Sequence, residues 1–140
     1  MDYDNNNPFA RILRGELPCV KVYEDELTLA IMDIMPQAEG HVLVLPKEPA
    51  AELFGLSDEA AAACIRTTKK VATAVKAAMG APGVMVAQLN GSAAGQTVPH
   101  VHFHVIPREQ AAVLKPHAAV AADVEQLRQI AARIIAALPA

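Results

Sequence analysis

The sequence has no surplus of basic residues, no long hydrophobic run and few cysteines. Twelve lysines and arginines stand against fifteen acidic residues, so the formal net charge is −3 at pH 7. Proteins that bind duplex DNA or an anionic membrane through their surface usually carry a positive patch. We therefore expect neither a nucleic acid nor a membrane as partner.

The hydrophobic stretches are all shorter than the roughly 20 residues that a membrane-spanning helix requires. The first residues, MDYDNNNPF, have neither the basic nor the apolar segment of an export signal. Cys19 and Cys64 do not form a CxxC pair, and isolated cysteines of this kind are more often packed as small hydrophobic residues than joined in a disulfide. These features predict a cytoplasmic protein.

With 140 residues, the chain is long enough for one domain with a substantial core and too short for two ordinary ones. We expect a single domain over residues 1–140. Residues 1–6 are polar and are expected to fray, and residues 115–140 are expected to form a tail that ends in a helix.

Alternating and continuous apolar segments predict five strands, at residues 19–24, 27–34, 41–46, 83–89 and 100–106. Short loops join the first three of these segments, which favours antiparallel pairing. The expected fold class is therefore α+β, with a mainly antiparallel five-stranded sheet.

Three helices complete this fold. Asn7 and Pro8 suit the start of a short N-terminal helix, and Ser57 and Gly80 suit the two ends of a long central helix. Asp123 suits the start of a C-terminal helix. The apolar positions at helical spacing are Cys64, Ile65 and Val75 in the central helix, and Leu127, Ile130, Ala131, Ile134 and Leu138 in the last one.

Residues 90–108, NGSAAGQTVPHVHFHVIPR, hold three of the five histidines. Successive side chains of a strand point to opposite faces. One face would therefore carry His100, His102 and His104, and the other Val101, Phe103 and Val105. Pro107 is expected to end the strand because it has no N–H group. The pattern predicts chemistry on one face and a hydrophobic core on the other.

The loop before these histidines consists of small residues from Gly91 to Gly95, followed by Gln96 and Thr97. Such a backbone bends freely, and its N–H groups can converge on an anion. Beside neutral imidazoles, this arrangement is typical of a site that holds a phosphate group.

Three interpretations of the histidines remain open at this point. A purely structural role would leave three titratable rings side by side, at a desolvation cost. Histidines at i and i+2 on a strand could also share a metal, although no other ligand pair is evident. Attack of a neutral imidazole on phosphorus explains both the loop and the histidines. In that case His102, in the centre, is the preferred nucleophile.

The segment from Ala94 to Arg108 resembles the signature of the histidine-triad (HIT) family. Matching segments lie upstream at residues 15–18, 22–25, 33–40 and 41–47. The resemblance covers roughly Phe9 to Arg108. It implies a homodimeric α+β domain that binds a purine nucleotide and hydrolyses a bond at its α-phosphate, with the middle histidine becoming nucleotidylated.

The resemblance also assigns roles to residues. His102 would be the nucleophile and His100 would orient it, while His104 and His41 would line the phosphate site. Asp33 would hold the ribose hydroxyls. Gly95 and Gln96 would offer donors to the phosphate, Thr97 would stand near the departing atom, and the base pocket would be formed by Phe9, Leu17 and Ile31.

Two departures from the family pattern matter. Many bacterial members bind a structural zinc, but the corresponding positions here are Asn7, Ala10, Pro49 and His100. We therefore expect no metal and no other cofactor. Relatives commonly place Asn or Gln where this chain has Leu89, and that amide contacts the phosphate or the leaving atom. The neighbouring Asn90 is the candidate for this contact here. Because successive strand residues point to opposite faces, the loop would have to adjust for Asn90 to reach the site.

The resulting hypothesis is a hydrolase for nucleoside phosphoramidates or related nucleotidyl compounds. One alternative is a non-catalytic nucleotide-binding or regulatory protein, which Leu89 favours. Another is a dinucleoside polyphosphate hydrolase.

Overall fold

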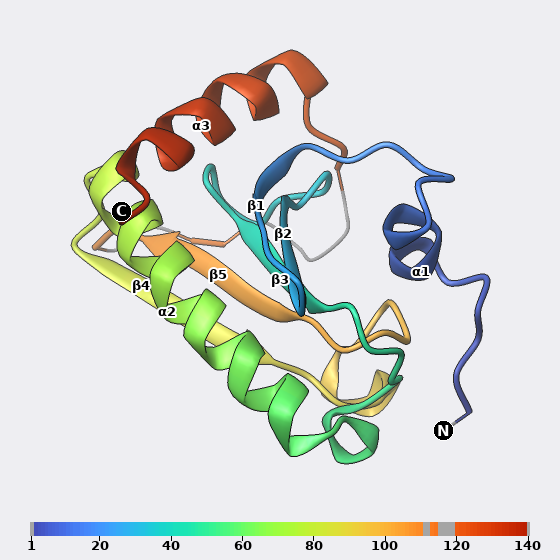
Figure 1. Ribbon diagram of the computed structural model, residues 1–140. Coiled ribbons are helices and arrows are strands. Elements are labelled where there is room, and N and C mark those ends of the chain that lie inside the picture. Colours follow the sequence, from blue (N-terminus) through green and yellow to red (C-terminus); the bar gives the residue numbers. More distant parts are fainter. Residues whose placement is uncertain (1, 111–112, 115–119, 140) are drawn as a thin grey trace.

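A computed structural model, which describes residues 2–110, 113–114 and 120–139, contains a five-stranded sheet flanked by helices (Figure 1). The strands lie in the order β1-β2-β3-β5-β4, and every neighbouring pair is antiparallel. Their bounds are Lys21–Glu24 (β1), Thr28–Met32 (β2), Val42–Pro46 (β3), Gly83–Gln88 (β4) and Phe103–Arg108 (β5). The predicted α+β fold with an antiparallel sheet is confirmed.

The helices are α1 (Pro8–Leu13), α2 (Asp58–Met79) and α3 (Val124–Ala137), with short 3₁₀ turns η1 (Leu53–Gly55) and η2 (Ser92–Ala94). The Asn7 side chain accepts a hydrogen bond from the Ala10 N–H at 2.9 Å, and the Ser57 hydroxyl accepts one from the Ala60 N–H at 3.1 Å. Both satisfy N–H groups that a helix start leaves unpaired. The predicted caps of α1 and α2 are thus confirmed.

The two faces of the sheet are covered by different helices (Figure 1). Alternate strand residues divide between two hydrophobic clusters: Ala30 and Met32 belong to the larger one, which includes α2 and α3, and Leu29 and Ile31 to the smaller one, which includes Phe9 of α1. The side-chain alternation of β2 therefore separates the main core from the α1 face.

The C-terminal helix α3 covers its own chain. Its Leu127, Ile130, Ala131 and Ile134 are buried, and the helix packs against α2 and β1. The Ile65 side chain of α2, which the sequence pattern placed on the apolar stripe, is instead 54% exposed. The buried face of α2 is centred on Cys64, Thr68 and Val71, so Ile65 points about a quarter turn away.

Strand β5 begins and ends later than the sequence pattern predicted. His100 and His102 precede its first residue, and Pro107 lies within it. Among the described strands, β3 pairs with Phe103–Val105, and the rest of β5 pairs with β4 alone. Pro107 therefore lies beyond the part of β5 that is paired on both sides, where a missing N–H is tolerated.

The N-terminal segment makes defined contacts where a frayed end was expected. The Asn7 side chain and backbone N–H both donate to the Asp4 carbonyl, at 2.7 and 3.1 Å, and the Arg14 guanidinium donates to the Asn5 carbonyl at 2.7 Å. Residues 115–119 and 140 of the predicted tail lie outside the described residues. Among the described helices, none has the length and apolar character needed to cross a membrane.

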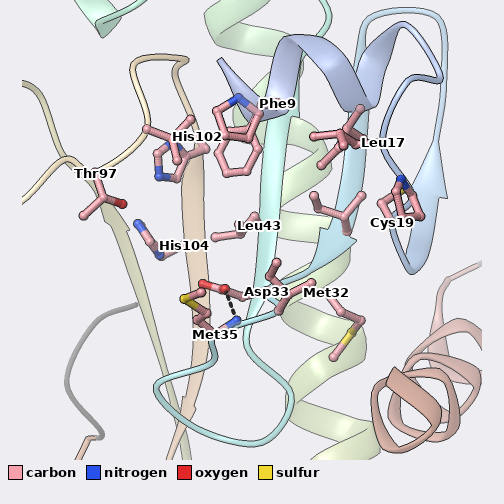
Figure 2. A pocket seen from close by; sticks show the side chains of 16 residues that line it. Phe9, Leu17, Cys19, Met32, Asp33, Met35, Leu43, Thr97, His102 and His104 are labelled. Atoms are coloured by element: carbon pink, nitrogen blue, oxygen red, sulfur yellow. Dashed lines mark hydrogen bonds between the residues drawn. The ribbon is translucent and has the colours of Figure 1, made fainter. Parts of the chain in front are cut away.

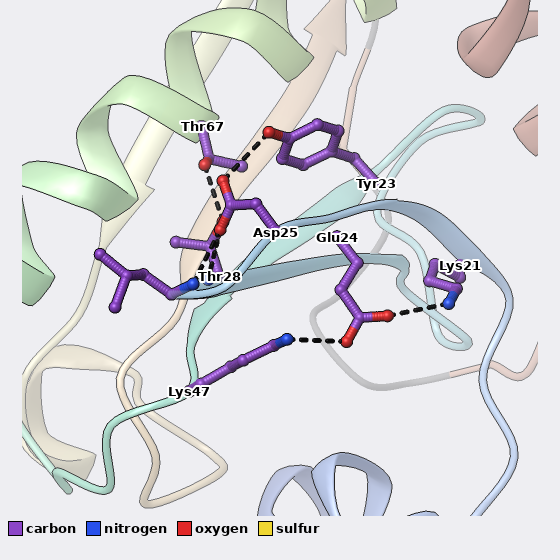
Figure 3. A network of polar contacts seen from close by, with 8 residues as sticks. Lys21, Tyr23, Glu24, Asp25, Thr28, Lys47 and Thr67 are labelled. Carbon is purple, nitrogen blue, oxygen red and sulfur yellow. Dashed lines mark hydrogen bonds and ion pairs between the residues drawn. The ribbon is translucent and has the colours of Figure 1, made fainter.

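The hairpin of β1 and β2 is closed by one carboxylate (Figure 3). Asp25 accepts from the N–H groups of Leu27 and Thr28 at 2.9 and 2.8 Å, and from the Tyr23 hydroxyl at 3.0 Å. The Thr28 hydroxyl lies 2.7 Å from that of Thr67 on α2. The turn is thereby fixed to the central helix.

Gly40, immediately before His41, tests how tightly the fold constrains the site. Its φ is +91°, and an added Cβ would lie 2.8 Å from Cγ of Met79. Gly40→Ala should lower the free energy of unfolding by about 2–4 kcal/mol, since strain and overpacking add. Urea denaturation measures this. The control is Gly55→Ala, where a Cβ meets nothing within 4 Å; an equal loss in both variants would contradict the prediction.

Candidate active site

A cavity of about 370 Å³ opens on the α1 face of the sheet (Figure 2). This volume lies in the range of small-molecule sites. The apolar part of its wall includes Phe9, Ile12, Leu17, Ile31, Leu43 and Val98, and the polar part includes Asp33, Thr97, His102 and His104. The cavity therefore combines an apolar end with a side rich in ionisable groups.

His102, His104 and His41 form a row, in which His102 and His104 line the cavity and His41 lies behind them. The ring centroids of His102 and His104 lie 4.9 Å apart, and those of His104 and His41 lie 5.1 Å apart. His104 is the partner of Leu43 in the β3–β5 register, so their side chains share the α1 face. Val101, Phe103 and Val105 belong to the core on the other face, as the alternation predicted.

The orientation of His102 is set by the main chain of its neighbour. Its Nδ1 lies 2.6 Å from the carbonyl oxygen of His100, and a carbonyl can only accept, so Nδ1 carries the hydrogen. In the neutral ring the lone pair is then on Nε2. Phe9 packs edge-on against this ring, with centroids 4.9 Å apart, and further restricts its rotation.

His100 lies behind His102 and does not line the cavity. Its Nε2 is 2.8 Å from the Pro46 carbonyl oxygen and its Nδ1 is 2.7 Å from the Tyr3 hydroxyl. Nε2 therefore donates and Nδ1 accepts. Burial lowers the pKa of His100, and the hydrogen bond to Pro46 opposes this shift only in part. The ring is held neutral, in one tautomer.

His41 supports His104 from behind. Its Nδ1 accepts from the Gln37 N–H at 3.1 Å, and its Nε2 lies 2.9 Å from Nδ1 of His104 and 3.5 Å from the Asp33 carboxylate. With both rings neutral, Nε2 of His41 donates to Nδ1 of His104, which places the hydrogen of His104 on its Nε2. His104 is thus arranged as a hydrogen-bond donor.

Asp33 lies at the end of β2, where the chain turns away from the sheet. One of its carboxylate oxygens accepts from the Met35 N–H at 2.8 Å, as Figure 2 shows. This bond fixes the orientation of the carboxylate at the cavity wall, and its other oxygen lies 3.5 Å from Nε2 of His41.

The loop before the triad is held by its own hydrogen bonds. The N–H groups of Gly95 and Gln96 donate to the carbonyls of Ser92 and Gly91. The Gln96 amide nitrogen donates to the carbonyls of Ala51 and Val98, at 2.7 and 2.9 Å. In this structure the donors expected to face a phosphate therefore maintain the loop.

Asn90 has a similar supporting position. Its side chain accepts from the Leu53 N–H at 2.8 Å and exchanges hydrogen bonds with the Gln88 amide. It does not line the cavity. Leu89, at the position where an amide was expected, lies beside Gly95.

The structure brings seven of the twelve expected site residues to the cavity wall. They are Phe9, Leu17, Ile31, Asp33, Thr97, His102 and His104. Sequence reasoning missed Cys19, Met35 and Leu43, which also line it. The alternation of β3 could have placed Leu43, but the other two lie in irregular segments that carry no periodic signal. Both cysteines are free.

One group among the described residues has ligand atoms spaced closely enough to hold a metal ion, and the expectation of no metal stays a prediction. Asp33, His41 and His104 each offer an atom within 4.8 Å of the others. However, Nε2 of His41 and Nδ1 of His104 share one hydrogen, whereas two metal ligands each need a bare lone pair. At the positions of the family's zinc, the Asn7 side chain caps α1 and both ring nitrogens of His100 have partners.

Comparison with known proteins places this arrangement in a family. The sequence model of the family described as HIT domain matches residues 14–111, well over half of the chain. The chain belongs to the HIT family. The match includes His41, His100, His102 and His104.

Relatives and solved structures agree with this assignment. Adenosine 5'-monophosphoramidase hnt1 of Schizosaccharomyces pombe is 47% identical over 100 residues, covering 71% of this chain and 72% of its own. Adenylylsulfatase HINT3 of Arabidopsis thaliana is 37% identical, covering 76% and 54%. A Hit-like protein involved in cell-cycle regulation from Bartonella henselae, solved with an unknown ligand, is 45% identical with a TM-score of 0.92, covering 98% and 100%.

The buried neutral state of His100 predicts a pH dependence of stability. The unfolded chain protonates this residue near pH 6.5, whereas the pKa of the folded ring is lowered. The free energy of unfolding should therefore fall as the pH drops below about 6.5, by at most about 1.4 kcal/mol per pH unit from this residue. Denaturation of wild type and His100→Gln between pH 7 and 5 measures it. Parallel pH curves would contradict the assignment.

Proposed function

We propose that this HIT protein hydrolyses purine nucleoside phosphoramidates, or related nucleotidyl compounds, at the α-phosphate. The observation that carries the proposal is the position of His102. Its ring lines a nucleotide-sized cavity, and its Nδ1–H is bound to a main-chain carbonyl, so that the lone pair is on Nε2. A neutral imidazole fixed in this way is a competent nucleophile.

The shape of the cavity supports a nucleotide. The purine base would occupy the apolar end, between Phe9, Leu17 and Ile31. Asp33, held by the Met35 N–H, would accept hydrogen bonds from the ribose hydroxyls. Base and ribose would then be fixed together, which places the α-phosphate beside the histidine row.

In the first step, Nε2 of His102 attacks the α-phosphorus and the bond from phosphorus to the leaving nitrogen breaks. The amine departs with a proton supplied by solvent. The nucleotidylated ring carries a positive charge, and its Nδ1–H donates more strongly to the His100 carbonyl at that moment. The Nε2–H of His104, positioned by His41, would donate to a phosphoryl oxygen.

In the second step, water attacks the same phosphorus and the bond to Nε2 of His102 breaks. This releases the nucleoside monophosphate and one proton and returns the neutral ring. The Thr97 hydroxyl at the cavity wall would stand near the departing or entering atom. Gly95, Gln96 and Asn90 would act by fixing the loop that presents Thr97, in keeping with their internal hydrogen bonds.

The names of the relatives are consistent with this chemistry. One is an adenosine 5'-monophosphoramidase and another an adenylylsulfatase. Both names describe removal of a group from an adenylyl phosphate, with different leaving groups. A mechanism through a nucleotidyl-histidine releases the leaving group first and gives the same intermediate whichever group has left, and so accommodates both.

We further propose that the protein is a homodimer. In the described part of the chain, β4 pairs with β5 alone and forms an edge of the sheet. Val86 of β4 is 48% exposed and Ile65 of α2 is 54% exposed. Unpaired strand edges with exposed apolar side chains favour pairing with another chain.

The catalytic proposal predicts that His102→Ala loses nearly all activity. Release of AMP from an adenosine phosphoramidate should fall by about 10³-fold or more, because the covalent route is removed. In the wild type, mass spectrometry after reaction with a slow phosphorothioate analogue should find the nucleotidyl group on His102. Thermal unfolding of both proteins controls for folding. Equal rates of AMP release by wild type and His102→Ala would contradict the catalytic role of His102 and favour a nucleotide-binding protein without turnover.

The dimer proposal predicts that Val86→Lys gives a monomer. A charge on the β4 edge would have to be buried without a partner in the interface. Sedimentation equilibrium should give twice the chain mass of 14.8 kDa for the wild type and a single chain mass for the variant. Val124→Lys is the matched control, since Val124 is also 48% exposed but begins α3. A monomeric wild type would refute the proposal.

A further inference from the structure

The Tyr3 hydroxyl makes a contact that the proposed chemistry does not by itself require. It lies 2.7 Å from Nδ1 of His100, and the two rings are in edge contact with centroids 5.6 Å apart. Tyr3 is separated from His100 by 97 residues. A long-range hydrogen bond to a fully buried ring next to the nucleophile indicates a role in the site.

The hydrogen bond reaches the nucleophile through the main chain. Because the Pro46 carbonyl, 2.8 Å from Nε2, can only accept, the single hydrogen of neutral His100 is on Nε2, and the Tyr3 hydroxyl donates to Nδ1. These two bonds fix the ring at both nitrogens. The carbonyl of the same residue accepts from Nδ1 of His102 at 2.6 Å. Tyr3, His100 and His102 therefore form one connected chain of hydrogen bonds.

The other tautomer of His100 would break this chain. With its hydrogen on Nδ1, the ring would present a lone pair on Nε2 to the Pro46 oxygen, and two acceptors 2.8 Å apart repel each other. The buried ring would have to turn or shift. Its backbone carbonyl, which holds His102, would shift with it. The Pro46 carbonyl, which can only accept, therefore selects the tautomer, and the Tyr3 hydroxyl donates to the lone pair left on Nδ1 and holds the ring in place.

Tyr3 itself is held by the segment that follows it. The Asp4 carbonyl accepts from the backbone and side chain of Asn7, and the Asp4 carboxylate accepts from the Asn6 N–H at 2.8 Å. Asn7 also caps α1, which carries Phe9 against the His102 ring. The N-terminal segment and α1 thus approach the nucleophile as one unit.

We propose that Tyr3 is a positioning residue for His102, acting by holding the His100 ring, and with it the His100 carbonyl, in place. It does not contact the cavity, so it would influence the rate of the chemical step and leave substrate binding unchanged. The kinetic part of this inference rests on the proposed hydrolase function. The part that concerns the His100 ring does not, because it describes the protein without substrate.

Tyr3→Phe is the direct test, because it removes the hydroxyl and keeps the ring that packs on His100. We expect kcat for adenosine phosphoramidate hydrolysis to fall about tenfold, as small displacements of a reacting group commonly do, with KM within about twofold of wild type. An unchanged kcat, or a raised KM with unchanged kcat, would overturn the proposal.

The chain offers a matched control in Tyr23, its only other tyrosine. The Tyr23 hydroxyl binds Asp25 and accepts from Lys70, in the hairpin network of Figure 3 and away from the cavity. Tyr23→Phe removes an equivalent hydroxyl and should leave kcat within about twofold of wild type. Equal losses of kcat in Tyr3→Phe and Tyr23→Phe would show a general effect of tyrosine loss and overturn the positioning role.

A spectroscopic measurement separates this inference from the function. In ¹⁵N spectra of the histidine rings at neutral pH, wild-type His100 should show its hydrogen on Nε2 alone, and Tyr3→Phe should shift the Nδ1 resonance, because that nitrogen loses its hydrogen-bond donor. If the wild type hydrolyses nothing, the proposed function fails and this signature still decides the role of Tyr3. An identical His100 pattern in both proteins would overturn it.

Discussion

The hydrogen bond between Nδ1 of His102 and the carbonyl of His100 determines which nitrogen of the central ring has its lone pair available. A carbonyl oxygen cannot donate, so the tautomer is fixed by backbone geometry and needs no charged partner. Many nucleophilic and basic histidines are oriented by a carboxylate. Here the peptide unit has that role, and the ring and its support are two residues apart.

The position of His100 and His102 depends on the sheet having a different set of side chains on each face. Val101 and Phe103 anchor the segment in the α2 core, while His102 and His104 face α1 and the cavity. A shift of one residue would exchange the two sets and bury imidazoles in the main core. The large hydrophobic free energy of the α2 face thus fixes the register of the face that carries His102 and His104.

The supporting residues lie in distant parts of the chain. His41 follows the loop after β2 and positions His104. Pro46, at the end of β3, binds Nε2 of His100. Tyr3, near the N-terminus, binds Nδ1 of the same ring. Each bond satisfies a buried ring nitrogen that would otherwise cost about 1–3 kcal/mol. These bonds lower the free-energy cost of burying the rings, and those to carbonyl oxygens also determine which ring nitrogen carries the hydrogen. The stability of the domain and the geometry of the site are therefore linked.

The sequence by itself determined the α+β class, the caps at Asn7 and Ser57, and the face on which the histidines lie, because these follow from local periodicity and from side chains that bond within a few residues. It also pointed to Asp33, Thr97 and the apolar pocket residues through the family resemblance. Tertiary structure alone decided that Gln96 and Asn90 hold the loop, that Cys19 and Met35 reach the cavity, that β5 continues through Pro107, and that Tyr3 bonds His100. These features depend on contacts between segments tens of residues apart, and no periodic pattern in a sequence records which distant partner a polar group will find.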